Sequence, residues 1–123
     1  MREFTDDECR SIIDEGSVPE SIRNSGERVA AIFTQSWCGD WIVMKRYLNK
    51  VEEPSLEVFF VEYDRKPFFE EMKNFKERVY RSGTIPYVRY FRDGELVNES
   101  NLVWRRKSFV KRFDTMRSRV SYR

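Results

Sequence analysis

Residues 28–41 read RVAAIFTQSWCGDW and contain a strand, a loop and the start of a helix. The run Arg28–Thr34 is short, apolar and rich in β-forming residues, which predicts a strand buried on both faces. The loop 35–39 leads directly into a helix, because apolar residues then repeat at helical spacing until Pro54 bars continuation. Those apolar residues are Trp41, Met44, Leu48 and Val51.

Cys38 stands at the junction of this strand and this helix. A thiol there lies beside unpaired N–H groups at the positive end of the helix dipole, and both favour the reactive thiolate. Asp40 opposes this effect, because it places a carboxylate two residues from the thiol. Cys38 is therefore the candidate nucleophile, with the helix start Gly39–Trp41 as its electrostatic support.

The rest of the chain alternates helices and strands. Thr5 and Glu8 form a capping-box pattern that predicts a helix over 5–15, ended by Gly16. The segment after Pro19 predicts one short helical turn. The remaining expected elements are a strand over 56–63, a helix from Pro67 to about Tyr80 closed by Gly83, strands over 87–91 and 95–99, and a helix over 105–119.

Two of these helices show an apolar stripe, and the two late strands flank a turn. Asp93-Gly94 is a strong hairpin signal. The stripes are Phe68, Met72, Phe75 and Val79 in one helix, and Phe109, Phe113, Met116 and Val120 in the other. The element order predicts an α/β fold in which a mixed central sheet of about four strands carries helices on both faces.

Composition excludes several kinds of site. The chain has 123 residues, two cysteines and no histidine. It cannot form a Ser-His-Asp or Cys-His dyad or an HExxH zinc site, and two cysteines cannot make a four-cysteine zinc site, so we expect no metal centre. The length predicts a single domain, 1–123. We expect no membrane span and no signal peptide, and hence a cytoplasmic protein.

Basic residues gather near the C-terminus, where Asp114 is their sole acidic neighbour. They are Arg105, Arg106, Lys107, Lys111, Arg112, Arg117, Arg119 and Arg123. Such a segment can steer anionic partners, or it can simply form the solvated face of a helix, which we favour. Trp104, Phe109 and Phe113 are better explained as core contacts. We therefore expect at most weak, non-specific, salt-sensitive binding of nucleic acid.

Four short motifs occur in order along the chain, and together they resemble those of the thioredoxin family from about residue 28 to 113. They are Trp37-Cys38-Gly39, Asp64-Arg65-Lys66-Pro67, Ile85-Pro86 and Asp93-Gly94-Glu95. The resemblance implies a thioredoxin-like fold with a core over 28–120, preceded by a helix and loop over 1–27. It also implies that Pro86 follows a cis peptide bond and that Ile85-Pro86 faces Cys38.

The sequence departs from that family at the residues that carry its chemistry. Trp41 stands where the motif WCGPC has its second cysteine, so a mixed disulfide on Cys38 cannot be resolved within the motif. Ile32 and Phe60 align with the family's buried acid and its partner lysine. Cys9 is the remaining thiol, and its place on a buried helix face makes it a core residue rather than a resolving thiol.

These departures leave three interpretations of Cys38. It can exchange thiols as a single-cysteine site that accepts glutathione or a protein thiol; it can act as a reversible oxidation sensor; or it can be a relic in a thioredoxin-fold module that only binds partners. The residues expected to form the rim for a partner peptide are Trp37, Gly39, Asp40, Trp41, Ile85 and Pro86, with Trp37 exposed and Trp41 partly buried. No oligomeric state follows from the sequence.

Overall fold

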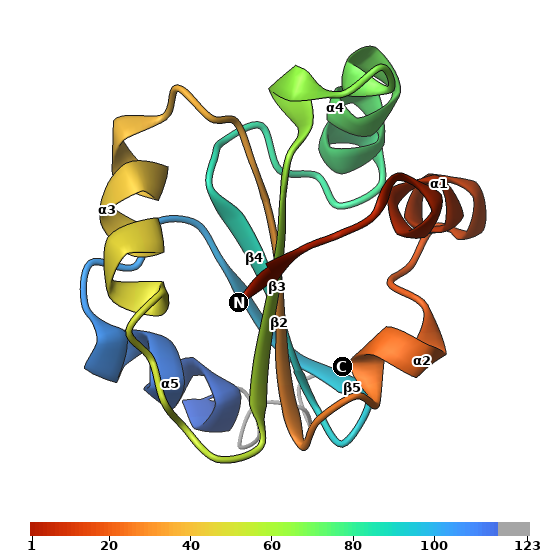
Figure 1. The fold of residues 1–123 in the computed structure, drawn as a ribbon. Helices are drawn as coiled ribbons and strands as arrows, with labels where there is room; N and C mark the ends of the chain where they lie inside the picture. The colour runs from red at the N-terminus through yellow and green to blue at the C-terminus, as the bar shows by residue number, and fades with distance from the viewer. Residues whose placement is uncertain (116–123) are drawn as a thin grey trace.

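A mixed sheet runs through the middle of the molecule, between two layers of helices (Figure 1). The computed structural model describes residues 1–115. Its strands are β1 (Arg2–Glu3), β2 (Arg28–Thr34), β3 (Leu56–Glu62), β4 (Tyr87–Arg92) and β5 (Glu95–Ser100). Its helices are α1 (Asp6–Glu15), α2 (Glu20–Arg23), α3 (Gly39–Leu48), α4 (Phe69–Arg78) and α5 (Arg106–Thr115), with a 3-10 turn at Tyr63–Arg65.

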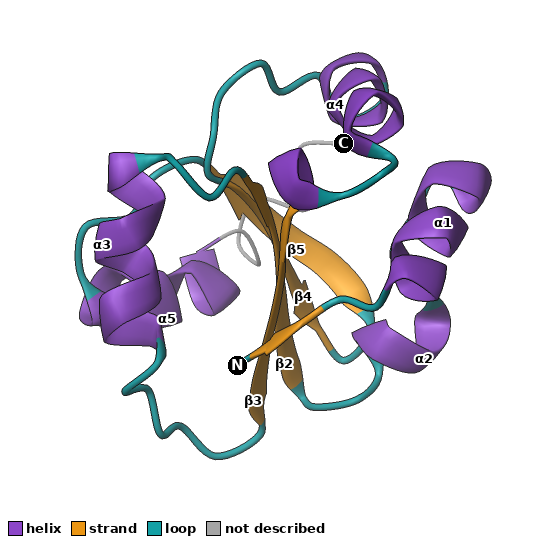
Figure 2. Cartoon of the chain, turned by 45° about the horizontal axis from the view of Figure 1, so that its top comes forward, coloured by secondary structure: helices purple, strands orange, loops and turns teal. Residues whose placement is uncertain are grey.

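The strand order is β1-β3-β2-β4-β5. β1, β3 and β2 are parallel to one another, whereas β4 is antiparallel to both β2 and β5. In Figure 1 α3 and α5 lie on one side of the sheet, and α1, α2 and α4 lie on the other; Figure 2 shows the same two layers from a second angle. The predicted α/β class and thioredoxin-like architecture are confirmed.

Each face of the sheet carries its own core, because alternate residues of β2 point to opposite sides. Ala31 and Phe33 belong to the core under α1 and α4. Ala30 and Ile32 belong to the core under α3 and α5, which also contains Cys38. Since β2 is buried on both faces, its sequence reads as a continuous apolar run, and its predicted bounds are confirmed.

The local signals at helix and hairpin ends are confirmed as well. Thr5 accepts a hydrogen bond from Glu8 N, and the Glu8 carboxylate accepts one from Thr5 N, which makes the predicted capping box. Gly16 ends α1 at φ 78°. The β4–β5 turn places Asp93 at φ 51° and Gly94 at φ 83°, the left-handed conformations that an Asp-Gly hairpin turn requires.

Three expectations about the elements are wrong. The sheet has a fifth strand, β1, whose length of 2 residues gives no periodicity to detect. α3 ends at Leu48, before Val51. α4 spans Phe69–Arg78 rather than Pro67 to about Tyr80, and Val79, which we placed on its buried stripe, is 53% exposed. Lys76 takes the buried position instead, one turn after Met72.

The C-terminal helix is described only in part. Phe109 and Phe113 are fully buried, as predicted. Met116 and Val120, together with the basic residues beyond Thr115, lie outside the described residues. Within residues 1–115, none of the helices has the length and apolar character that crossing a membrane requires.

We predict that the protein loses stability steeply above about pH 10. Burial raises the pKa of Tyr80 and Tyr90 to about 12, and it also raises the pKa of Tyr63 and Tyr87. A raised pKa gives stability that is present below the unfolded value of about 10 and is lost as pH rises toward the folded value. Each tyrosine removes about 1.4 kcal/mol per pH unit in that window. Urea unfolding at pH 8 and pH 11 measures the difference.

Tyr80→Phe is the control for this prediction. The Tyr80 hydroxyl is buried without a hydrogen-bond partner among the described residues, so its removal should not destabilise the protein at pH 8. It should also reduce the loss at pH 11. Lys76 has the opposite effect, because burial lowers its pKa and it therefore adds stability as pH rises. It is a single group, whereas several tyrosines lose stability in this range. Equal unfolding free energies at the two pH values would contradict the prediction.

Candidate functional site

The loop before Cys38 is held by a charge-assisted pair of hydrogen bonds. Ser36 donates its backbone N–H to Asp64 Oδ1 and its hydroxyl to Asp64 Oδ2, each at 2.7 Å. Asp64 belongs to the 3-10 turn that follows β3, and β3 pairs with β2, so the ends of both parallel strands lie at the same edge of the sheet. Asp64 was quoted as a sequence landmark, but its role as an anchor was not predicted.

Cys38 is the N-cap residue of α3 and is only 6% exposed. Its side chain makes no capping hydrogen bond to the helix. The thiol instead donates to the carbonyl of Ile85, with 3.9 Å between Sγ and O. The structure thus places Cys38 and Ile85 face to face across the end of the sheet, and the peptide bond between Ile85 and Pro86 is cis.

The expected rim residues fall into two groups. Trp37 is 67% exposed, and its indole N–H donates to Gln35 Oε1 at 2.6 Å. Gly39 and Asp40 are also exposed, while Ile85 is half-buried and Pro86 is buried. An incoming partner would therefore meet Trp37 and the first turn of α3 on one side of Cys38, and Ile85 on the other.

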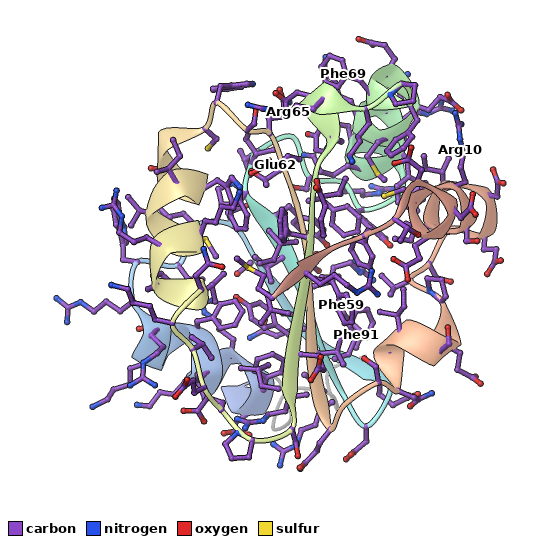
Figure 3. All side chains as sticks on the ribbon, viewed as in Figure 1. Arg10, Phe59, Glu62, Arg65, Phe69 and Phe91 are labelled. Carbon is purple, nitrogen blue, oxygen red and sulfur yellow. The ribbon has the colours of Figure 1, made fainter. Side chains whose placement is uncertain are left out.

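Trp41 requires a correction, because it is fully buried rather than part of the rim. Its ring lies 5.4 Å from that of Phe60 on β3, centroid to centroid. Its indole N–H donates to Glu62 Oε2 at 2.8 Å, and Lys45 donates to the same oxygen at 2.9 Å. Figure 3 shows Glu62 at the end of β3, with Arg65 beyond it.

Glu62 stays ionised beneath α3. Partial burial raises the pKa of Glu62, but the hydrogen bonds from Trp41 and Lys45 outweigh this and leave the pKa lowered. Glu62, Lys45, Arg46 and Arg65 also line a surface hollow of about 500 Å³ beside Ser36. Among residues 1–115, no group of His, Cys, Asp or Glu side chains is arranged to hold a metal ion.

The apolar interior below Cys38 contains no acid at the family's position. Ile32 and Phe60 are paired residues on neighbouring strands, and both are buried. The two positions that align with an acid and a lysine are thus in contact distance of each other but apolar, so they cannot relay a proton to a leaving thiolate.

Cys9 lies in the core on the opposite face of the sheet from Cys38. It is fully buried, and burial raises the pKa of its thiol to about 12. Both cysteines are free. Cys9 therefore cannot serve as a resolving thiol in this fold.

Lys76 on α4 is a residue near the site that our sequence analysis missed. It is 1% exposed, and its ammonium donates to the carbonyls of Ser82 and Thr84 at 2.6 and 3.0 Å. Those carbonyls lie in the loop that leads to Ile85-Pro86. Its spacing of four residues from Met72 was the available signal, because i and i+4 share a helix face.

No family model matches the sequence, and no curated protein matches it either. Solved structures do resemble the fold. Reduced desulfothioredoxin from Desulfovibrio vulgaris Hildenborough has a TM-score of 0.61 at 12% identity, covering 94% of this chain and 96% of that chain. Oxidized thioredoxin O2 from Arabidopsis thaliana has a TM-score of 0.59 at 19% identity, covering 89% of each chain.

A buckwheat glutaredoxin–glutathione complex gives a TM-score of 0.53 at 16% identity, covering 94% of this chain and 96% of that chain. Thioredoxins and glutaredoxins are thus both structural neighbours. At these identities the likeness establishes the fold: the chain has the thioredoxin fold, with Cys38 at the start of the helix that follows β2.

We predict that iodoacetamide labels Cys38 and spares Cys9 in the native protein. Cys38 is 6% exposed and lies at the edge of the sheet, whereas Cys9 is fully buried and its pKa is raised to about 12. Alkylation requires the thiolate and access to it. Peptide mass mapping after labelling at pH 8, with and without urea, measures both sites. Labelling of Cys9 at a rate equal to that of Cys38 before unfolding would contradict the prediction.

Proposed function

We propose that the protein carries out thiol–disulfide exchange with Cys38 as its single reactive thiol. The observation that supports this most directly is the placement of Cys38 Sγ at the start of α3, 3.9 Å from the Ile85 carbonyl and adjacent in sequence to the exposed Trp37. Backbone groups at a strand start and an exposed aromatic side chain are both suited to holding a peptide next to the sulfur.

The exchange has two steps. In the first, the Cys38 thiolate attacks a partner disulfide, the new S–S bond forms, the partner's S–S bond breaks, and one partner sulfur leaves as a thiolate that takes a proton from solvent. In the second, an external thiol attacks the mixed disulfide, is oxidised by it, and releases Cys38. Glutathione or a protein thiol supplies that second sulfur.

The external thiol is required by the surroundings of Cys38. Trp41 occupies the position of a second cysteine, Cys9 lies across the sheet, and Ile32 offers no proton. One structural neighbour, the buckwheat glutaredoxin, is seen in complex with glutathione, which supports glutathione as the first thiol to test here.

A second candidate function is a binding module in which Cys38 does not exchange. The low exposure of Cys38, 6%, favours it, because a partner disulfide must approach the sulfur along its S–S axis. In this alternative Trp37 and Ile85 still contact the partner. An oxidation sensor would use the same sulfur, with peroxide as the oxidant and a sulfenic acid as the product.

The proposal includes a cytoplasmic location, where free thiols persist, and thiols or disulfides of proteins and small molecules as partners. We do not propose nucleic acid as a specific partner. In the described part of the basic segment, Arg106 Nη1 forms an ion pair with Glu53 Oε2 at 3.4 Å, and the Asn98 amide donates to the carbonyl of Arg112. Both residues therefore make contacts that stabilise the fold.

We predict that glutathione disulfide converts Cys38 to a glutathione mixed disulfide that persists until a thiol is added. The expected product carries one glutathione per chain, because Cys9 is fully buried, and it persists because no second thiol of the fold reaches Cys38. Intact-mass measurement detects the adduct, and dithiothreitol should remove it. Catalysis of dithiothreitol-driven insulin reduction should be negligible compared with a CxxC thioredoxin, because the mixed disulfide with insulin cannot be resolved within the chain.

Cys38→Ser and Cys9→Ser are the matched variants for this experiment. The first should abolish the adduct and the second should retain it. An adduct absent from the wild type, in a protein that folds normally, would support the binding module instead. Trp41→Cys is a poor test, because removing a fully buried tryptophan leaves a cavity that costs about 3–5 kcal/mol and deprives Glu62 of a donor.

A further inference from the structure

Lys76 is the most deeply buried charged side chain near the site, with 1% of its surface exposed. Lysine is almost never buried unless its charge is satisfied, because desolvating an ammonium is unfavourable. Burial accordingly lowers the pKa of Lys76. An apolar side chain would fill this buried helix position, one turn after Met72, at no electrostatic cost. A lysine here therefore needs hydrogen-bond acceptors for its ammonium group.

The partners of Lys76 are backbone carbonyls of one short loop. Its Nζ donates to Ser82 O at 2.6 Å and to Thr84 O at 3.0 Å. The Ser82 N–H in turn donates to the carbonyl of Lys76 at 3.2 Å. Lys76 therefore contacts this loop through both its side chain and its backbone.

This loop follows a strained turn and ends at the site. Arg81 has φ 57°, a left-handed conformation that is unfavourable for a residue with a side chain. Ile85, whose carbonyl faces Cys38 Sγ, is the residue directly after Thr84. In Figure 1 the segment between α4 and β4 lies at the end of the sheet where α3 begins. Moving Thr84 would thus move the Ile85 carbonyl relative to the thiol.

We propose that Lys76 is a positioning residue that holds residues 82–85 so that the Ile85 backbone faces Cys38 in a form that a peptide can bind. The inference rests on the proposed exchange function and deepens it. Lys76 does not touch the sulfur; it acts through the two carbonyls. An apolar side chain of similar length would fill the same space but would leave both carbonyls without their donor.

Loss of Lys76 should slow the reaction of Cys38 with a peptide disulfide more than its reaction with a small disulfide reagent. A peptide disulfide needs the loop backbone as a docking surface, whereas a small reagent such as 5,5′-dithiobis(2-nitrobenzoate) needs only access to sulfur. Lys76→Met should therefore slow reaction of Cys38 with a cystine-bridged peptide by about tenfold or more, because one charge-assisted hydrogen bond is worth about that factor and the variant loses two. Its rate with the small reagent should change by less than about twofold, because that reaction makes no use of the bond.

Lys73→Met is the matched control, because Lys73 lies on the same helix and is only half-buried. It should leave both rates unchanged. Lys76→Gln, which retains two N–H donors on a shorter stem, should fall between wild type and Lys76→Met, and it replaces Lys76→Met if that variant does not fold. Equal loss of both rates, or no loss of either, overturns the positioning role.

Amide hydrogen exchange separates this inference from the exchange function itself. In Lys76→Met the amide of Ser82, which donates to the carbonyl of Lys76, should exchange faster while those of β2 and α3 remain as in Lys73→Met. Unchanged protection of the Ser82 amide overturns the inference whatever the thiol does. If wild-type Cys38 reacts with neither disulfide, the proposed function fails, but faster exchange at Ser82 would still establish Lys76 as the anchor of the loop.

Discussion

The burial of Trp41 between α3 and β3 determines the chemistry available to Cys38. The indole fills the position where a second cysteine would stand, packs on Phe60 and donates to Glu62. Glu62 also accepts from Lys45, so the first turns of α3 are tied to the end of β3 by both apolar and ionic contacts. Replacing Trp41 by cysteine would remove its contacts with Phe60 and Glu62, and those contacts hold α3 in place. In the exchange function that we propose, Cys38 therefore reacts with sulfur atoms that come from outside the chain.

Cys38 and Ile85 lie in two loops that meet, and a charged side chain anchors each loop. Asp64 fixes Ser36 and so the approach to Cys38, and Lys76 fixes Ser82 and Thr84 and so the approach to Ile85. Both anchors use a charged side chain against backbone or hydroxyl groups, which gives shorter and stronger hydrogen bonds than neutral pairs. The separation of 3.9 Å between Cys38 Sγ and Ile85 O is the result of both anchors rather than of a direct strong bond.

The sequence predicts the fold well wherever a local pattern and the tertiary structure agree. The apolar run of β2, the capping box at Thr5 and the Asp93-Gly94 turn each have a physical cause within a few residues. β1 is too short to show a pattern and exists only because β3 offers an edge to pair with. Val79 is misassigned and Lys76 is missed, because apolarity predicts which side chain is buried, whereas here Lys76 is buried and donates to the loop carbonyls of Ser82 and Thr84. Cys38 was found from its place at a strand–helix junction, but the burial of Trp41 depends on Phe60 and Glu62, which are remote in sequence.

Cys38 is nearly buried, so a partner can reach its sulfur only if a neighbouring residue moves. Ile85 is held through its own loop, and Trp41 is fixed beneath the helix. Trp37 donates a hydrogen bond from its indole to Gln35, but 67% of its surface is exposed, so it is the flanking residue that can move at the least cost in packing. A partner that replaces the contacts of Trp37 with its own apolar surface would open the sulfur and gain contact area in the same step. In the exchange function that we propose, a partner that contacts Trp37 would therefore have an advantage over a small thiol such as glutathione, which has to reach the sulfur of Cys38 without that contact.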